Sequence, residues 1–87
     1  MKQISMHTVS SSQIKSIGYD EETQILYIEF QNGIVYQYIN FPKEKFDAML
    51  IPTISIGQYF QKEIRTNPSQ LYAKTEYKVH DGILTIQ

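Results

Sequence analysis

The sequence contains neither cysteine nor tryptophan. Without cysteine, neither a disulfide nor a thiolate-bound zinc ion can supplement the hydrophobic core of this 87-residue chain. No run approaches the roughly 20 apolar residues that a membrane-spanning helix needs, and the first residues lack the apolar stretch of a signal peptide. We therefore expect a soluble cytoplasmic protein with no membrane partner.

The sequence also has little net charge, because eight basic and nine acidic residues give a formal charge of -1 at pH 7. Tight sequence-independent binding to duplex DNA needs a dense basic surface, since neutralised phosphates supply most of the affinity. Four basic residues fall in the last third of the chain: Lys62, Arg65, Lys74 and Lys78. Acidic residues separate them, so we interpret this region as a solvated surface of mixed charge.

Residues suited to catalysis or metal binding are sparse. His7 and His80 are the conventional neutral-pH bases, and neither has a second ligand or a nucleophile nearby in the sequence. The serines at 10–12 precede an apolar residue, a pattern typical of turn hydrogen bonds. The acidic residues at 20–22 occupy a tight turn, where their carboxylates diverge. We expect no enzyme activity, no cofactor and no metal site.

The clearest structural signal is residues 25–39, where two alternating runs of strand-forming residues meet at an Asn-Gly pair. This pattern predicts a β-hairpin, for which two registers are open. A two-residue loop would place Phe30 opposite Val35. A three-residue loop with Gly33 in the left-handed region would place Phe30 opposite Ile34.

The three-residue loop sorts the side chains better, so we favour it. It gathers six large apolar or aromatic side chains on one face: Leu26, Ile28, Phe30, Ile34, Tyr36 and Tyr38. It sends Glu29 and Gln37 to the opposite face. The tyrosines of the second strand would then be half-buried, with their hydroxyls near the rim of the core.

A further strand precedes the hairpin and two helices follow it. Residues 14–19 predict the first strand of an antiparallel meander, in which Gly18 permits close approach of a neighbouring backbone. Pro42 marks the start of a short helix that Pro52 ends. The apolar stripe of this helix is Phe46, Met49 and Leu50. The second helix begins at the capping-box pair Ser55 and Gln58 and runs to about Arg65, with the apolar stripe Ile56, Tyr59, Phe60 and Ile64.

The tail at residues 69–87 predicts a second hairpin. A two-residue turn at its Asp-Gly pair would place Val79 opposite Leu84 and Tyr77 opposite Ile86. An isolated hairpin is only marginally stable in water, so we expect it to extend the main sheet or pack on a partner subunit. The predicted fold class is α+β: one domain, residues 1–87, with a three-stranded antiparallel meander, extended by the C-terminal hairpin, and two short helices on one face.

A set of short motifs between Val9 and Arg65 covers about two thirds of the chain. It comprises Ser11-Ser12, Gly18-Tyr19-Asp20, Phe30 with Asn32-Gly33, Tyr36-x-Tyr38, Pro42, Ser55-x-Gly57, Tyr59-Phe60 and Ile64-Arg65. Together these motifs resemble the KTSC domain, found at the C-terminus of some lysyl-tRNA synthetases and as free-standing bacterial and phage proteins. The resemblance implies an α+β core at residues 9–65, a suggested RNA-binding role and no established catalytic activity. Residues 69–87 form a less similar extension.

Six residues are candidates for binding a ligand or nucleic acid: Tyr36, Tyr38, Ser55, Gly57, Lys62 and Arg65. The tyrosines can stack on nucleobases, free N–H groups at the start of the second helix can hold a phosphate, and the two cations supply positive charge. Each also fits a structural role, as core, helix cap or helix-end cation. We expect the cations at the opposite end of the helix from Gly57.

The sequence therefore predicts a non-catalytic binding module for RNA or a nucleotide-like ligand. The alternative is a protein-interaction module that assembles into a homo-oligomer through an exposed sheet edge or the C-terminal hairpin. A phage or bacterial protein that sequesters a nucleotide signal at a subunit interface would combine the two.

Overall fold

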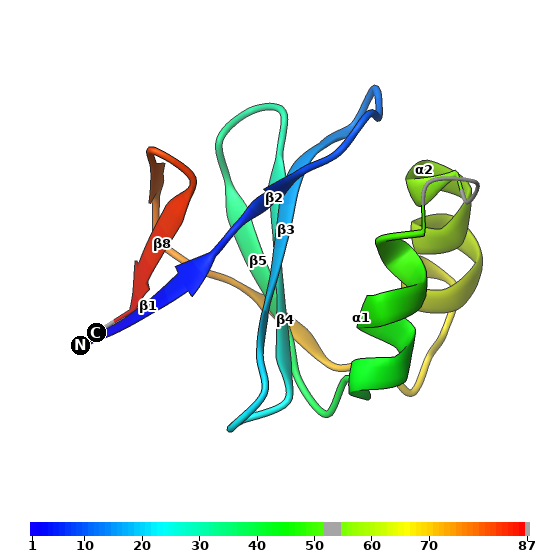
Figure 1. Ribbon diagram of the computed structural model, residues 1–87. Coiled ribbons are helices and arrows are strands. Elements are labelled where there is room, and N and C mark those ends of the chain that lie inside the picture. Colours follow the sequence, from blue (N-terminus) through cyan, green and yellow to red (C-terminus); the bar gives the residue numbers. More distant parts are fainter. Residues whose placement is uncertain (52–54, 87) are drawn as a thin grey trace.

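The computed structural model describes residues 1–51 and 55–86. It has three layers, with a five-stranded sheet in the middle, helices on one face and a three-stranded sheet on the other (Figure 1). Its strands are β1 (Lys2–Ser5), β2 (His7–Thr8), β3 (Ile14–Asp20), β4 (Ile25–Phe30), β5 (Val35–Tyr38), β6 (Tyr72–Lys74), β7 (Val79–His80) and β8 (Ile83–Ile86). The helices are α1 (Lys43–Met49), α2 (Ile56–Tyr59) and the π-helical η1 (Phe60–Arg65). The α+β fold class, with antiparallel sheets and two short helical segments, is confirmed.

The hairpin β4–β5 lies at the centre of the larger sheet, whose strand order is β2-β3-β4-β5-β6. Glu29 pairs with Val35, and the Phe30 N–H donates to the Ile34 carbonyl at 3.0 Å. Gly33 has a φ of 86°. The three-residue loop is therefore confirmed, and with it the face on which each hairpin side chain lies.

A β-bulge in β3 adds side chains to the helix-facing core. The register with β4 shifts between Ile14 and Ser16, so that Ile14 and Ile17 both become fully buried on the same face. Regular alternation would have sent them to opposite faces. The helix-facing core comprises Ile14, Ile17, Leu26, Ile28, Tyr38, Phe41, Phe46, Met49, Ile56, Phe60 and Ile64.

The two helical segments cover this face as predicted, with one exception. Phe46 and Met49 of α1 are buried, but Leu50 is 39% exposed and its place in the apolar stripe was wrong. Leu50 lies at the C-cap, where the helix ends and no longer directs the side chain at the sheet. Pro52, predicted to end this helix, lies outside the described residues. The Gln58 N–H donates to Ser55 Oγ at 3.4 Å, which confirms the N-cap of α2.

The opposite face of the large sheet carries a second core that the sequence did not indicate. Tyr27 and Val35 pack there against Ile4, Met6 and Leu84. The small sheet, of order β1-β8-β7, supplies this cover. Glu29 is buried on the same face, where the Ser16 hydroxyl donates to its carboxylate at 2.7 Å. The face we assigned to polar side chains is therefore largely enclosed.

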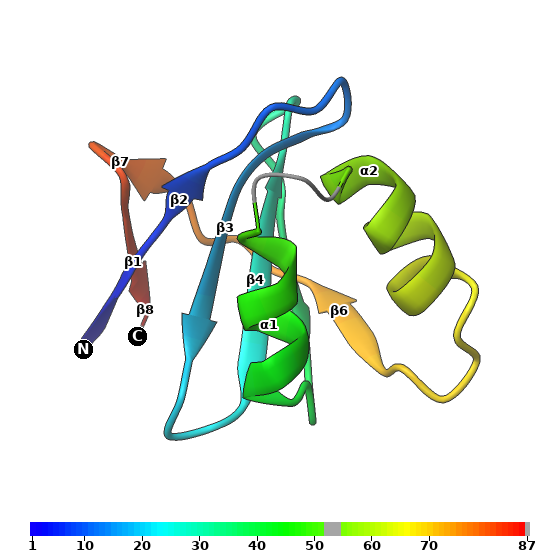
Figure 2. The same ribbon diagram turned by 45° about the vertical axis from the view of Figure 1, so that its right-hand side comes forward.

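The C-terminal hairpin forms this second sheet with β1 and does not extend the first. Val79 pairs with Leu84 as predicted, whereas the ladder of β7 covers only Val79 and His80 and does not reach Tyr77. The edge next to β5 is taken instead by β6 (Figure 2). Because β8 pairs along its length with β1, the residues we read as a short N-terminal arm are part of the fold.

Two contacts hold β1 against the large sheet. A Cβ placed on Gly18 would lie 2.4 Å from Met6 Sδ and 3.0 Å from the Ser5 carbonyl oxygen, so only glycine permits this approach. The Lys2 ammonium also pairs with the buried Asp20 carboxylate at 2.9 Å. In the part of the chain that the structure describes, no helix is long and apolar enough to cross a bilayer.

Candidate functional site

A hollow of about 320 Å³ lies between the end of η1 and strands β5 and β6. We call it the aromatic groove, because five of its lining residues carry aromatic rings: Phe30, Tyr36, Tyr38, Phe60 and Tyr72. Its other lining residues are Gln13, Asn32, Ile64, Arg65, Asn67 and Gln70. The groove thus combines flat apolar surfaces with amides and one guanidinium group.

Strand pairing builds the aromatic floor. β5 pairs with β6 so that Tyr38 lies opposite Tyr72, and their rings stack with centroids 5.8 Å apart and planes 29° apart. Tyr36 lies beside them, 6.2 Å from Tyr72 between ring centroids. Phe60 meets Tyr38 edge to face at 6.1 Å. Packing therefore fixes the orientation of the rings before any ligand arrives.

Burial differs sharply among the three tyrosines. Tyr36 is partly buried as expected, Tyr38 is only 5% exposed, so half-burial was wrong for it, and Tyr72 is 66% exposed. Burial raises the pKa of Tyr38, the nearby Tyr36 and Tyr72 add to this, and Arg65 opposes it. Tyr38 therefore supports the groove as a neutral phenol, while Tyr72 presents its ring to solvent.

The η1 helix places the cation of the groove. Its residues follow the π-helical pattern, and the Thr66 N–H donates to the Gln61 carbonyl at 3.2 Å. Phe60 and Ile64 point into the core, while Arg65 lines the groove. Within residues 1–51 and 55–86, Arg65 makes no ion pair with a carboxylate. The Arg65 guanidinium is therefore available to pair with an anionic ligand. π-helical segments are also frequent at functional sites.

Two amides of the groove are held in defined orientations. Asn32 Oδ1 accepts from the Ile34 N–H and Asn67 Oδ1 accepts from the Ser69 N–H, each at 3.0 Å. With the oxygens engaged, each side chain keeps its NH₂ group as a donor. A third amide, Gln70, donates at 2.7 Å to the Ile39 carbonyl and fixes the segment that leads into β6.

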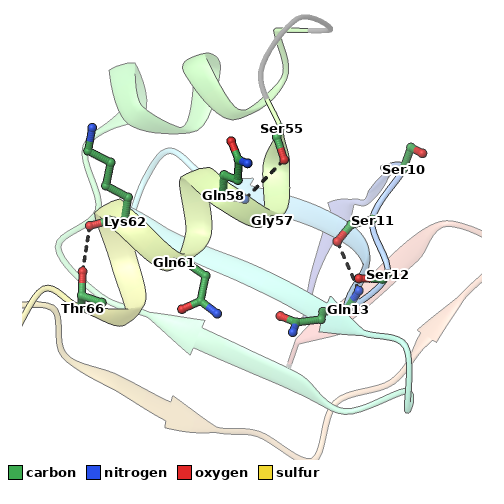
Figure 3. A pocket seen from close by; sticks show the side chains of 10 residues that line it. All are labelled: Ser10, Ser11, Ser12, Gln13, Ser55, Gly57, Gln58, Gln61, Lys62 and Thr66. Carbon is green, nitrogen blue, oxygen red and sulfur yellow. Dashed lines mark hydrogen bonds between the residues drawn. The ribbon is translucent and has the colours of Figure 1, made fainter.

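A second hollow of about 680 Å³ lies on another side of the same helix (Figure 3). We call it the serine groove; it is lined by Ser10, Ser11, Ser12, Gln13, Ser55, Gly57, Gln58, Gln61, Lys62 and Thr66. The Ser11 hydroxyl accepts from the Gln13 and Ile14 N–H groups at 3.2 Å, as predicted for serines in a turn. In Figure 3 the Lys62 side chain extends away from these serines.

The structure divides the six predicted site residues between the two grooves. Tyr36, Tyr38 and Arg65 line the aromatic groove, whereas Ser55, Gly57 and Lys62 line the serine groove. Gly57 lies in α2, whereas Lys62 and Arg65 lie in η1, so the serine groove extends along the helix from Gly57 to Lys62. His7 and His80 line neither groove.

Sequence reasoning missed two lining residues that matter. Tyr72 is the most exposed ring of the aromatic groove, and its only signal is a short Leu-Tyr-Ala-Lys run that is too brief to identify a strand. Gln13 lines both grooves and directly precedes the bulged start of β3. Nothing in the sequence around Gln13 indicates that position.

Comparison with known proteins adds a family to this geometry. The sequence profile of the KTSC domain matches residues 10–67. An uncharacterized protein of Stutzerimonas stutzeri (strain A1501) is 39% identical over 62 residues, covering 71% of this chain and 82% of the relative. A protein of Tsukamurella paurometabola is 44% identical over 45 residues, which is 52% of this chain and 67% of the relative.

A solved structure shares the architecture. The crystal structure of a KTSC domain protein from Yersinia pestis superposes with a TM-score of 0.72 at 32% sequence identity. The similarity covers 83% of this chain and 97% of that one.

Proposed function

The chain belongs to the KTSC domain family, and on that premise we propose that it is a non-catalytic module that binds single-stranded RNA or a nucleotide-like ligand in the aromatic groove. The observation that supports this most directly is the exposed ring of Tyr72, stacked on the buried ring of Tyr38 beside Arg65. A rigid aromatic platform next to a cation is the arrangement that single-strand binding proteins use for base and phosphate.

The size of the groove is consistent with a single base. About 320 Å³ is at the lower end of the range of roughly 300–1,000 Å³ for small-molecule sites. A nucleobase can stack on Tyr72 or on Tyr36, whose ring planes are tilted by 47°, and such a stack contributes about 1–3 kcal/mol per base. A flat base stacked on one tyrosine ring removes an apolar face of each from water, which favours a base over an aliphatic ligand.

The polar groups of the groove suit the edges of such a base. The NH₂ groups of Asn32 and Asn67 are donors, and they match the carbonyl oxygens of uracil better than the amino group of adenine. Arg65 adds a charged donor for a phosphate. The modest number of cations and the overall charge of -1 argue for single strands, where stacking contributes more, over duplexes.

The experiment that tests the proposal uses the chain's own tyrosines as reporters, since it has no tryptophan. Octauridylate is titrated into the protein while tyrosine fluorescence is recorded, because a base stacked on Tyr36 or Tyr72 quenches their emission. We expect saturable quenching that weakens as salt rises, and much weaker binding of a duplex DNA of equal length. Absence of saturable binding to octauridylate, and to a mixed-sequence single strand, would refute the proposal.

Self-association is the second candidate function, and the sheet edge at β6 favours it. All three residues of β6 are exposed, and Leu71 just before it is 59% exposed. Such an edge can pair with a second copy. The C-terminal hairpin is a weaker candidate interface, because Leu84 packs fully buried within its own chain. Sedimentation velocity of the wild type and Leu71→Glu tests this: a dimer that the substitution dissociates supports it, and a monomeric wild type excludes it.

A further inference from the structure

We infer that the serine groove is a second subsite, which takes the nucleotide next to the one stacked in the aromatic groove. The inference rests on the proposed function and narrows it. The ligand is a single-stranded RNA of at least two nucleotides, with its bases and backbone divided between two chemically different hollows.

The first reason is that the two grooves adjoin. Gln13 lines both of them. Arg65 and Thr66 are consecutive in the chain, and the first lines the aromatic groove while the second lines the serine groove. A strand whose phosphate lies near Arg65 can therefore continue past Gln13 into the second hollow.

The second reason is the complementary chemistry of the two linings. The residues of the serine groove include no aromatic ring, so a base cannot stack there as it can on Tyr72. They are mostly hydroxyls and amides, which suit a ribose and the oxygens of a phosphate. A ribose 2′-hydroxyl both donates and accepts, and a carboxamide can match either role.

The third reason is that the amides of the serine groove are available. Figure 3 shows the hydrogen bonds among its lining residues: Gln13 N–H to Ser11, Gln58 N–H to Ser55, and the Thr66 hydroxyl to the Lys62 carbonyl. None of these uses a glutamine side-chain amide. In the same view the side chains of Gln13 and Gln61 turn toward each other across the hollow.

Relative size supports a chain longer than one nucleotide. The serine groove, at about 680 Å³, is about twice the volume of the aromatic groove, at about 320 Å³. A mononucleotide stacked on Tyr72 would leave the larger hollow filled only with water. A dinucleotide would exchange that water for direct contacts with the amides, so its affinity should exceed that of the mononucleotide.

The test compares the affinities of UMP, pUpU and the deoxyribose analogue of pUpU for the full chain by calorimetry. We expect pUpU to bind about tenfold more tightly than UMP, because a second nucleotide adds the binding free energy of one stacked base or a few hydrogen bonds.

Gln61→Ala should lower the ratio of pUpU affinity to UMP affinity about three- to tenfold, because the variant loses one or two hydrogen bonds to the second nucleotide. Gln61 is exposed, so the variant should fold. Gln3→Ala, an exposed glutamine on β1, is the matched control and should leave the ratio unchanged.

The outcomes separate the two claims. Equal affinities for UMP and pUpU, or an unchanged ratio in Gln61→Ala, would refute the second subsite and leave the aromatic groove as a mononucleotide site. A deoxyribose analogue that binds as tightly as pUpU would refute the assignment to RNA. If neither UMP nor pUpU binds, the proposed function itself fails, and the second subsite with it.

Discussion

Tyr38 and Tyr72 face each other across the β5–β6 pair, one ring buried and the other open to solvent. Their centroids lie 5.8 Å apart with an interplanar angle of 29°. The exposed ring therefore stacks on the buried ring of its cross-strand neighbour. Through this stacked pair, the short edge strand β6 forms one wall of a groove that can bind a planar ligand.

Tyr72→Ala should weaken ligand binding without unfolding the protein. Loss of one stacking partner at about 1–3 kcal/mol corresponds to a fall in octauridylate affinity of about 5- to 150-fold. The Tm should change little, because the side chain is 66% exposed. Leu71→Ala is the control, since Leu71 is 59% exposed and lines neither groove. Equal effects of the two substitutions on affinity would contradict the stacking role.

Arg65→Gln should weaken binding in a salt-dependent way. A cation that contacts one phosphate of a single strand contributes about 0.7 to the slope of log affinity against log salt concentration. The variant should therefore lose affinity chiefly at low salt, and its slope should become shallower by about that amount. Lys15→Gln removes an equal charge from an exposed residue of β3 that lines neither groove, and should keep the wild-type slope. An unchanged slope in Arg65→Gln would exclude a phosphate contact.

The same substitution at two glycines should have opposite effects on stability. Gly18→Ala places a methyl group 2.4 Å from Met6 Sδ and 3.0 Å from the Ser5 carbonyl, and should cost about 1–3 kcal/mol of unfolding free energy. Gly57→Ala meets only Ser11 Oγ at 3.6 Å and removes a flexible residue from α2. It should be neutral or stabilise by up to about 1 kcal/mol. Urea denaturation of both variants checks the pair, and a stable Gly18→Ala protein would contradict the close packing of β1.

Asp20 should make the attachment of β1 sensitive to acid. Burial alone would raise the pKa of Asp20, but hydrogen bonds from Lys2, Thr23 and the Glu22 N–H outweigh it and hold the pKa below the usual 3.8. A lowered folded-state pKa stabilises the fold above the unfolded value. This contribution should decline as the pH falls below about 4 and disappear once Asp20 is protonated in the folded state.

The measurement is the unfolding free energy against pH for the wild type and Asp20→Asn. The variant should be less stable at pH 7 and lose less stability between pH 5 and pH 2. Asp47→Asn removes a carboxylate whose pairing with Lys43 is exposed, so it should retain the acid dependence of the wild type. Parallel pH profiles for the wild type and Asp20→Asn would show that the Lys2–Asp20 pair does not stabilise β1.

The central hairpin could be predicted from the sequence because its side chains alternate and its loop demands glycine. Only one register separates Glu29 and Gln37 from the apolar face, and that register is the one observed. The cap of α2 was readable for a similar reason, since Ser55 and Gln58 act locally. The two-residue alternation was sufficient to predict the hairpin, and the local spacing of Ser55 and Gln58 was sufficient to predict the cap.

The second sheet could not be predicted, because it depends on contacts between the two ends of the chain. β1 pairs with β8 across 78 to 84 residues of sequence, and β1 carries a single apolar residue, Ile4, by which it could be recognised. The bulge at Lys15 was equally hidden, since it breaks the alternation on which a strand is recognised. Gln13 lies next to that bulge and lines both grooves, so its place in the candidate site had no sequence signal either.

The most direct test of the central claim is a map of backbone amide shifts by ¹H–¹⁵N NMR during titration with octauridylate. We expect the perturbed amides to be those of Tyr36, Tyr38, Arg65 and Tyr72, on β5, the end of η1 and β6. A titration that perturbs only the C-terminal hairpin β7–β8, or no amide at all, would contradict it.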